Sequence, residues 1–325
     1  MRAWQVTSLG EPVEALELLN LEAPHPGPGQ VRIRVRAVGI NFADVLLARG
    51  QYQVRPPLPF VPGIELCGEV VELGADVSGL EVEQRVVASL IGALAEEVVV
   101  ATHLVRPAHE QLDDAAASVL TVSYQTAWFA LHQRARLASG ETVVVHAAAG
   151  GVGLAAVQLA AAAGARVIAV VGGPTKAAEA LKAGAHEVVD RTEQDVLSAL
   201  RELTGRRGAD VVIDPVGGDA FDASARTMAL EGRIVLIGFA GGRMQEMKPG
   251  PVLVKNYSVL GLHWALYLEA RPDLVTRADT EIGRLIAEGA VRPLVADVVP
   301  FEQAPSALER LSDGKIVGRL AVSIP

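Results

Sequence analysis

The residues with the clearest chemical use form a glycine-rich turn between an apolar strand and an alanine-rich helix. The turn keeps the second and third glycines of the pattern G-x-G-x-x-G at Gly150 and Gly153, with Ala148 in place of the first. Gly150 would let the backbone approach a pyrophosphate, Gly153 would let helix and strand close up, and the helix start presents N–H groups to the anion. A tight turn that binds nothing is the alternative. The residues expected to hold a dinucleotide are Ala148, Gly150, Gly151, Val152 and Gly153.

The type of dinucleotide depends on the residues after the second strand, which is predicted over 166–171. An NAD site offers a carboxylate there to the ribose hydroxyls, whereas this chain has the sequence Gly172-Gly173-Pro174-Thr175-Lys176. No carboxylate would repel a 2′-phosphate, and Lys176 together with Arg191, after the third strand, can neutralise one. The charge pattern therefore predicts NADPH as the cofactor, against the alternative that Lys176 is an ordinary surface lysine.

Composition argues against several other kinds of chemistry. The chain has 325 residues and one cysteine, Cys67, so neither an internal disulfide nor a cysteine-rich zinc site is expected. The seven histidines show no ligand-like spacing, so we predict no metal site. A net charge of −9 disfavours nucleic acid and anionic membranes as partners and leaves a small-molecule substrate. Residues 147–165 carry no charge and are long enough to suggest a membrane-spanning helix. Alanine and glycine predominate in this segment, however, and they insert weakly into membranes, so we do not expect it to span one. The lone cysteine indicates a reducing, cytoplasmic location.

Buried strands alternate with helices from residue 142 to about residue 261. Valine and isoleucine crowd most of these strands, as is typical of a parallel sheet covered on both faces. Helices are predicted over 151–163, 175–183, 194–204 and 219–229. Strands are predicted over 142–147, 166–171, 187–189, 209–213, 233–238 and 257–261. Six strands joined by crossovers predict a doubly wound α/β fold of the Rossmann type.

The first 110 residues are predicted to be rich in β-structure. Residues 30–38 alternate apolar side chains with arginines, which indicates a strand with one wet face. The end of the chain gives a helix over 273–288, a strand over 297–299, a helix over 302–312 and a strand over 319–324. These strands are expected to return to the first domain. The predicted domains are therefore residues 1–122 with 266–325, and residues 123–265.

A series of short motifs follows in order along the chain. They are Gly39-Ile40-Asn41-Phe42-Ala43-Asp44, Pro62-Gly63-Ile64-Glu65 with Gly68, the turn at 147–153, Asp214-Pro215-Val216-Gly217-Gly218 and Lys255-Asn256. Together these motifs resemble the medium-chain dehydrogenase/reductase superfamily, specifically its zinc-free quinone oxidoreductase and zeta-crystallin branch. The resemblance covers essentially the whole chain. It implies a GroES-like, β-rich catalytic domain in addition to the Rossmann domain.

Zinc-dependent members of that superfamily have a cysteine at the position of Asn41 and a histidine at the position of Ile64. Isoleucine cannot ligate a metal, and a catalytic zinc needs about three protein ligands. Without a Lewis acid, the acceptor must already be polarised by conjugation, as in a quinone or an α,β-unsaturated carbonyl. By the resemblance, Asn41, Tyr52 and Thr126 line the nicotinamide end of the cleft and are the catalytic candidates.

The resemblance suggests individual roles for these side chains. Asn41 and Thr126 would bond the carboxamide or ribose of the cofactor. Tyr52 would either donate to a developing oxyanion or form an aromatic wall. Asp44 would organise the loop that follows its strand.

Further cofactor contacts follow from the resemblance alone. Phe239 and Gly241 lie where relatives contact the nicotinamide side, and Lys315 matches a basic residue that reaches the 2′-phosphate in some relatives. Thr175 replaces the family's usual serine in the segment that also contains Gly173. Relatives commonly have a tyrosine where this chain has Arg191, and an arginine fork would retain phosphate recognition.

Three functions stay open at this point. An NADPH-dependent quinone reductase is preferred, and a reductase of activated alkenes such as enones, alkenals or enoyl thioesters fits nearly as well. A coenzyme A substrate would require a basic surface, for which Arg49 and Arg55 are the nearby candidates. A cofactor-binding structural or regulatory protein without turnover is the third. The family also implies a homodimer formed through the sheet edge at 257–261, where Val259 and Leu260 are apolar.

Overall fold

The computed structural model describes residues 1–325 and divides into two compact units. The first unit comprises Met1–Val122 and Pro293–Pro325, and the second comprises Ser123–Arg292. The prediction placed residues 266–325 in the first domain, but residues 266–292 pack within the second unit. The reason is visible in two contacts: the Trp128 indole donates to Glu281 Oε2 at 2.6 Å, and the Tyr267 ring lies 4.3 Å from that of Phe129.

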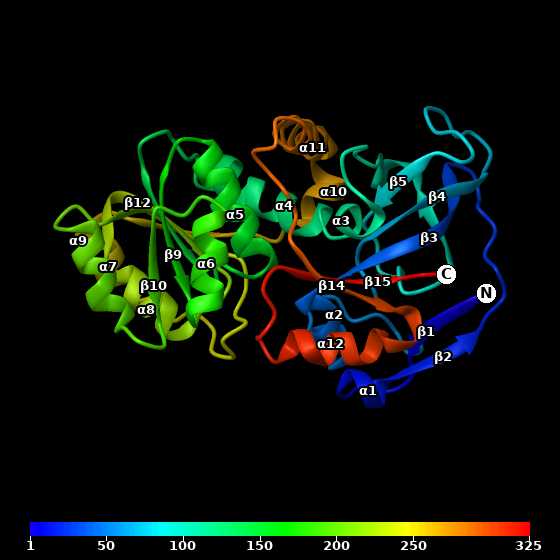
Figure 1. Ribbon diagram of the computed structural model, residues 1–325, viewed down its shortest axis with the longest axis horizontal. Helices are drawn as coiled ribbons and strands as arrows, with labels where there is room; N and C mark the ends of the chain where they lie inside the picture. Colours follow the sequence, from blue (N-terminus) through cyan, green and yellow to red (C-terminus); the bar gives the residue numbers. More distant parts are fainter. The chain divides into compact units, whose positions relative to one another are not determined.

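The second unit is built on a six-stranded sheet in which every neighbouring pair is parallel (Figure 1). Its strand order is β10-β9-β8-β11-β12-β13. The strands are β8 (Thr142–His146), β9 (Arg166–Val171), β10 (Glu187–Asp190), β11 (Ala209–Asp214), β12 (Met228–Leu236) and β13 (Ser258–Gly261). This order reverses between β8 and β11, as in doubly wound dinucleotide-binding folds, so the predicted fold class is confirmed.

One boundary in this unit differs from the prediction. The helix expected over 219–229 ends at Ala225, and β12 begins at Met228 rather than at residue 233. Met228 pairs with Ala209 of β11, and this pairing draws the segment into the sheet. A sequence pattern does not show that pairing, because the partner lies far along the chain.

Helices connect the strands of the second unit. They are α5 (Gly151–Ala162), α6 (Pro174–Lys182), α7 (Val196–Thr204), α8 (Gly218–Ala225), α9 (Pro249–Lys255), α10 (Ala265–Ala270) and α11 (Pro272–Ala287). Right-handed crossovers place α5 and α6 on one face of the sheet and α7 and α8 on the other. In agreement, α5 contacts β8 and β9, whereas α8 contacts α7, β11 and β12. Strands β8, β9 and β11 are buried between these two helical layers.

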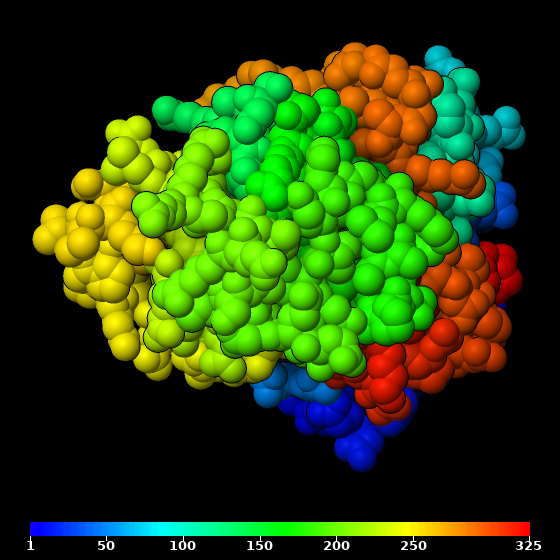
Figure 2. All heavy atoms as spheres, turned by 60° about the vertical axis from the view of Figure 1, so that its left-hand side comes forward, coloured from blue at the N-terminus to red at the C-terminus, as the bar shows by residue number.

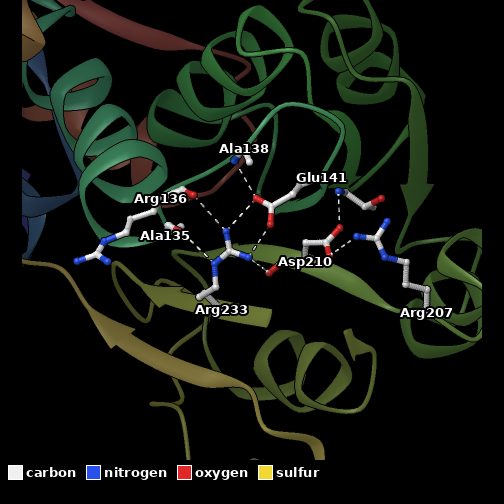
Figure 3. A network of polar contacts seen from close by, with 8 residues as sticks. Ala135, Arg136, Ala138, Glu141, Arg207, Asp210 and Arg233 are labelled. Carbon is white, nitrogen blue, oxygen red and sulfur yellow. Dashed lines mark hydrogen bonds and ion pairs between the residues drawn. The ribbon is translucent and has the colours of Figure 1, made fainter. Parts of the chain in front are cut away.

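A dense polar network fixes the sheet near the amino ends of β8 and β11 (Figure 3). Arg233 donates to both oxygens of Glu141 at 2.8 Å and to the carbonyl oxygens of Ala135 and Asp210. The Asp210 carboxylate accepts from the N–H of Thr142. Burial raises the pKa of Glu141, but the hydrogen bonds from Arg233 and from a backbone N–H lower it below its usual value overall. The network ties the loop before β8 to the sheet.

The first unit contains a seven-stranded sheet and a two-stranded one. The larger sheet has the order β14-β15-β3-β4-β5-β7, and β6 also pairs with β3. Its strands are β3 (Gln30–Ile40), β4 (Leu66–Leu73), β5 (Arg85–Ala88), β6 (Glu97–Ala101), β7 (Val105–Pro107), β14 (Val295–Pro300) and β15 (Arg319–Ser323). The smaller sheet pairs β1 (Arg2–Val6) with β2 (Leu16–Asn20). As expected, the last strands return to this unit and the apolar side chains of β3 point into its core.

Short helices complete the first unit. They are α1 (Pro12–Ala15), α2 (Phe42–Ala48), α3 (Asp114–Ser118) and α12 (Ala304–Ser312), with 3-10 turns at Thr102–Leu104 and Phe301–Gln303. Helix α4 (Thr121–Trp128) begins in the first unit and continues into the second, where a π-helical turn follows at Phe129–Arg134. None of the helices combines the length and the apolar character that crossing a membrane requires.

Candidate active site

In the second unit, the candidate residues other than Thr126 lie in the turns, loops and helix starts that follow the carboxyl ends of the parallel strands. Strand order reverses between β8 and β11, and each strand leads outward into a loop there. Open α/β sheets bind ligands at such a switch point, because the diverging loops leave a crevice. The glycine-rich turn follows β8 at this position.

The glycine-rich turn brings its backbone unusually close to the start of α5. Ala147 adopts a left-handed conformation with φ of 49°, and its carbonyl oxygen accepts from Gly150 N–H at 2.9 Å. A Cβ at position 153 would overlap the carbonyl oxygen of Ala147, so only glycine fits there. The first N–H groups of α5 have no partners within the helix. The turn therefore has the geometry of an anion seat at a helix N-terminus.

Two cations lie next to each other after β9 and β10. A Cβ at position 172 would come within 3.2 Å of the Arg191 guanidinium, which therefore lies over Gly172. Burial lowers the pKa of Lys176, and the nearby charge of Arg191 lowers it further. Two like charges held this close repel each other, so an anion bound between them would be stabilised.

Asp190 holds the turn after β9, a role that no local sequence pattern predicts. Its Oδ1 accepts from the N–H of Gly173 at 2.9 Å and from both the N–H and hydroxyl of Thr192. These bonds, that from Gly173 first, lower the pKa of Asp190. Gly173 itself has a φ of 92° and precedes α6. Asp190 thus holds the loop on which Thr175 and Lys176 follow.

The loops after β11 and β12 are bonded together. Phe239 and Gly241 lie in the second loop, in which Gly241 N–H donates to Val216 O at 2.9 Å. Asp214, fully buried, accepts from the N–H groups of Val216 and Gly217 through Oδ1. Gln245 adds a bond from Nε2 to Asp214 Oδ2 at 3.1 Å. Sequence reasoning missed Gln245, because nothing local marks a glutamine that braces a second loop.

In the first unit, Asn41 is the centre of a buried polar cluster at the start of α2. Its side-chain Nδ2 donates to Gly39 O at 3.1 Å and to Glu65 Oε1 at 2.9 Å. Glu65 is fully buried and pairs with Arg319 at 2.6 Å. Both amide hydrogens of Asn41 are therefore used inside the unit. Its amide oxygen forms part of the capping box with Asp44 at the start of α2, and the second lone pair of that oxygen is what Asn41 can offer to a ligand.

Asp44 holds two loops together, the role expected for it. Its Oδ2 accepts from Asn41 N–H at 2.9 Å and its Oδ1 from Gly63 N–H at 3.1 Å. Burial raises the pKa of Asp44 to about 7, and the Glu65 charge adds to the rise while the bond from Asn41 opposes it.

The remaining candidates are divided between the two units. Tyr52 is half-buried against the core of the first unit, and burial, followed by the charge of Asp44, raises its pKa. Lys315 is exposed in the first unit, with Nζ 3.4 Å from Asp313 Oδ2. Thr126 is buried on α4 in the second unit. The structure thus groups Asn41 with Asp44 in the first unit, and Lys176 with Arg191 in the second.

The donor set around Asn41 does not resemble a metal site. Nowhere in residues 1–325 do three His, Cys, Asp or Glu side chains form a group that could hold a metal ion. Cys67 is buried, and burial raises the pKa of its thiol to about 12, so it stays protonated. Its Sγ lies 3.6 Å from Asp114 Oδ1.

Both units match known family models. Residues 27–110 match the alcohol dehydrogenase GroES-like domain, and residues 151–278 match the model described as zinc-binding dehydrogenase. This combination defines a medium-chain dehydrogenase/reductase. The chain belongs to the quinone oxidoreductase family of that superfamily, as its relatives show, and the predicted family is confirmed.

Three relatives illustrate this similarity. Quinone oxidoreductase-like protein 2 of Mus musculus is 38% identical over 99% of this chain and 92% of that protein. The structure of Escherichia coli quinone oxidoreductase complexed with NADPH is 29% identical, covers 100% of both chains and has a TM-score of 0.92. A phenolphthiocerol/phthiocerol polyketide synthase chain of Mycobacterium tuberculosis is 32% identical over 96% of this chain, but the match is 14% of that longer protein.

Proposed function

We propose that the protein is an NADPH-dependent reductase that transfers a hydride to a quinone without zinc. The observation that carries the proposal is the pairing of Lys176 with Arg191 at the end of β9 and β10, in the same sheet as the close approach at Gly153. The first arrangement suits a 2′-phosphate and the second suits a diphosphate. The Escherichia coli relative, whose structure is a complex with NADPH, supports this choice of cofactor.

The described residues fit such a cofactor. Only glycine fits at position 153, no carboxylate follows β9 directly, and the guanidinium of Arg191 lies over Gly172. The proposed cofactor contacts are Asn41, Thr126, Ala148, Gly150, Gly151, Val152, Gly153, Gly173, Thr175, Lys176, Arg191, Phe239, Gly241 and Lys315.

The cofactor supplies the hydride, and the chain supplies orientation. Asn41 offers an amide oxygen to an N–H or hydroxyl donor, and Thr126 offers a hydroxyl that can bond the same end of the cofactor. A tyrosine is protonated at neutral pH, and the raised pKa of Tyr52 keeps it so, which leaves its hydroxyl able to donate to a developing oxyanion as well as to line the pocket. The variant Y52F separates these two uses, because only the first lowers kcat.

The absence of zinc from the proposed mechanism rests on the donor chemistry. Ile64 has no lone pair, the Asn41 amide hydrogens are committed to Gly39 and Glu65, and the Cys67 thiol is protonated. A quinone is already polarised by conjugation, so hydride transfer to it requires no Lewis acid.

A panel of acceptors tests the proposal. Purified protein receives NADPH or NADH with 1,4-benzoquinone, 9,10-phenanthrenequinone, a 2-alkenal or crotonyl-CoA, and the loss of reduced-nicotinamide absorbance is followed. We expect turnover with NADPH and the quinones, and no stoichiometric zinc by metal analysis. Preference for NADH would contradict the assignment of Lys176 and Arg191, and one zinc per chain would contradict the zinc-free mechanism.

Reduction of activated alkenes is a second candidate. The similarity to part of a polyketide synthase favours it. The basic surface that a coenzyme A ester would need is weak, because Arg49 donates to both oxygens of Glu11 and to Ser312 Oγ. Faster turnover of crotonyl-CoA than of any quinone would establish this alternative. Binding of NADPH without turnover of any acceptor would support a structural or regulatory role instead.

We also propose a homodimer formed through β13, the edge strand of the six-stranded sheet. Its outer side has no partner strand, and Leu253 and Val254 of the adjoining α9 are 77% and 81% exposed. Figure 2 shows the segment around these residues, in yellow, as a projecting corner of the second unit. Edge strands beside exposed apolar side chains favour pairing with a second chain. Sedimentation at micromolar concentration should give a dimer, and a monomer would contradict the proposal.

A further inference from the structure

Glu65 joins three separate segments of the first unit. Its Oε1 accepts from Asn41 Nδ2 at 2.9 Å and from the Arg319 guanidinium at 2.6 Å. Its Oε2 accepts from the N–H of Val122 at 2.9 Å. The carboxylate is fully buried, and each of these donors comes from a different element: the turn after β3, β15, and the start of α4.

This arrangement determines which way the Asn41 amide faces. In the observed orientation, Nδ2 donates to Gly39 O and to Glu65 Oε1. A flipped amide would place its oxygen against these same two acceptors. Gly39 O would lose this donor, and the amide oxygen would lie against the Glu65 carboxylate, to which Arg319 and Val122 still donate. Glu65, together with Gly39 O, therefore keeps the nitrogen of Asn41 turned inward. The amide oxygen lies at the capping box of α2, facing the N–H of Asp44, and keeps a second lone pair for a ligand.

Gly39 makes room for the carboxylate. A Cβ at position 39 would lie 2.9 Å from Glu65 Oε1 and would overlap the carbonyl oxygen of Ser118. Any larger side chain would displace the Glu65 carboxylate from Asn41. The glycine in β3 and the glutamate before β4 thus serve the same local geometry.

We infer that Glu65 is a positioning residue that fixes the Asn41 side chain as a hydrogen-bond acceptor for the carboxamide N–H of the nicotinamide. This inference rests on the proposed function, because it assigns the ligand of Asn41. Its consequence is selectivity within the cofactor: a carboxamide has an N–H to donate, whereas a methyl ketone in the same place has none. A site that presents a fixed acceptor discriminates against a ligand without the donor.

Replacing Glu65 by glutamine changes this selectivity. The glutamine amide meets three donors, from Asn41, Arg319 and Val122, and brings two further N–H groups of its own. The N–H groups of the glutamine and those of Asn41 Nδ2 would then face each other. Rotation of the Asn41 amide relieves this conflict, and the Asn41 side chain then presents an N–H to the ligand in place of its oxygen.

The experiment measures dissociation constants for NADPH and for its reduced 3-acetylpyridine analogue by calorimetric titration. The natural protein should prefer NADPH by about tenfold, the worth of one net hydrogen bond. In E65Q and E65D the preference should fall toward unity, and kcat for NADPH should fall more than KM for the quinone rises. E65D retains the negative charge near Arg319, so the same two dissociation constants can be measured on E65D if E65Q does not fold.

A matched control is D210N in the second unit. Asp210 is also a buried carboxylate that accepts a backbone N–H and an arginine, but it belongs to the network near the amino ends of the sheet. D210N should keep the full preference for NADPH. Equal weakening of both cofactors in E65Q and E65D, with their ratio unchanged, would show that Glu65 is merely structural and would overturn the inference.

The test also separates this inference from the proposed function. A natural protein that binds NADPH but does not distinguish it from the analogue overturns the role of Asn41 and Glu65 alone. A natural protein that binds neither compound overturns the proposed function, and the inference with it.

Discussion

The two ends of the six-stranded sheet in the second unit differ in how their charged groups are arranged. Near the amino ends, Arg233 gives its hydrogen bonds to Glu141 and to backbone carbonyls, and Asp210 accepts from Thr142 and Arg207 (Figure 3). At the carboxyl ends, the start of α5 offers N–H groups without helical partners, and the cation Arg191 lies near Lys176. At one end a cation is paired with a carboxylate, and at the other end two cations lie side by side.

This difference distinguishes a network that stabilises the fold from two cations that we propose bind a phosphate of the cofactor. A matched network contributes to stability and has no capacity left for an anion. Adjacent cations contribute little to stability, because they repel each other, but an anion placed between them is held by both. Substitutions at the two ends should therefore change different measured quantities.

The largest loss of stability should follow from R233A. The substitution leaves the Glu141 carboxylate without its main partner, and both side chains are mostly buried, at 18% and 20% exposed. Breaking such a pair should lower the free energy of unfolding by about 3 kcal/mol. Denaturant titration measures this loss, and calorimetric titration of the folded variant should give an unchanged NADPH dissociation constant.

The control for this change is R207A. Arg207 also bonds a carboxylate, that of Asp210, but its side chain is 66% exposed. Its loss should change stability by no more than about 0.5 kcal/mol. The proposed contrast fails if R233A and R207A lower the free energy of unfolding by the same amount.

The pair of Arg233 with Glu141 should also make stability depend on pH. Because the pKa of Glu141 is lowered in the folded protein, its stabilising contribution is present above the unfolded pKa and is lost on acidification. The decrease of the free energy of unfolding at acid pH should therefore be smaller in R233A than in the natural protein.

A smaller loss of stability, joined to a loss of binding, should follow from G153A. The added Cβ overlaps the Ala147 carbonyl oxygen, and overpacking of this kind should cost about 2 kcal/mol. Since the start of α5 must move away, NADPH affinity should also fall by at least about tenfold.

The matched substitution G150A tests the cause. A Cβ at position 150 would meet only the Ala147 oxygen at 3.3 Å, and its φ of −87° suits alanine. G150A should therefore unfold like the natural protein but bind NADPH less tightly. Equal stability of G153A and G150A would show that the close approach at position 153 is not needed.

The smallest effects on stability should come from K176A and R191A. Each should change the free energy of unfolding by less than about 0.5 kcal/mol, as surface substitutions usually do. Each should weaken NADPH binding by about tenfold or more and leave NADH binding unchanged, because a charged hydrogen bond to the 2′-phosphate is lost. K182A, on the same helix and 72% exposed, is the control and should bind both cofactors normally.

Preference for NADPH over NADH should decrease as the pH is raised into the alkaline range. The pKa of Lys176 is lowered in the free protein, and a bound phosphate would raise it, so the charged ammonium favours binding. Affinity is consequently lost as pH rises through the pKa of the free protein. K176R should keep its preference at alkaline pH, because the guanidinium stays protonated. A preference with the same pH profile in K176R and in the natural protein would contradict the role of Lys176.

The fold was more predictable than the details of the site. The glycine turn and the buried strands carry local signals, so the doubly wound fold class and the strand over 166–171 agree with the sequence pattern. The placement of residues 266–292 could not be predicted, because it depends on tertiary contacts such as that of Trp128 with Glu281. Local patterns do not encode which distant residue will meet an indole N–H.

The same limit applies to the polar groups around the candidate site. Glu65 stands in a recognisable motif, but its partner Arg319 is 254 residues away. Likewise, Gln245 braces a loop by reaching Asp214, 31 residues earlier in the chain. Residue type and spacing identify a group that can bind, whereas the atom that it presents depends on partners that only the folded chain brings near.

The path of the chain has a mechanical consequence. The second unit, Ser123–Arg292, is inserted between the two segments of the first, and both chain termini belong to the first unit. A pulling force applied to the termini is therefore borne initially by the first unit, in which β15 is hydrogen-bonded between β14 and β3. Until those strands separate, little tension reaches the inserted sheet. The nucleotide-binding part of the chain is thus shielded from end-to-end stretching by the unit that surrounds it in sequence.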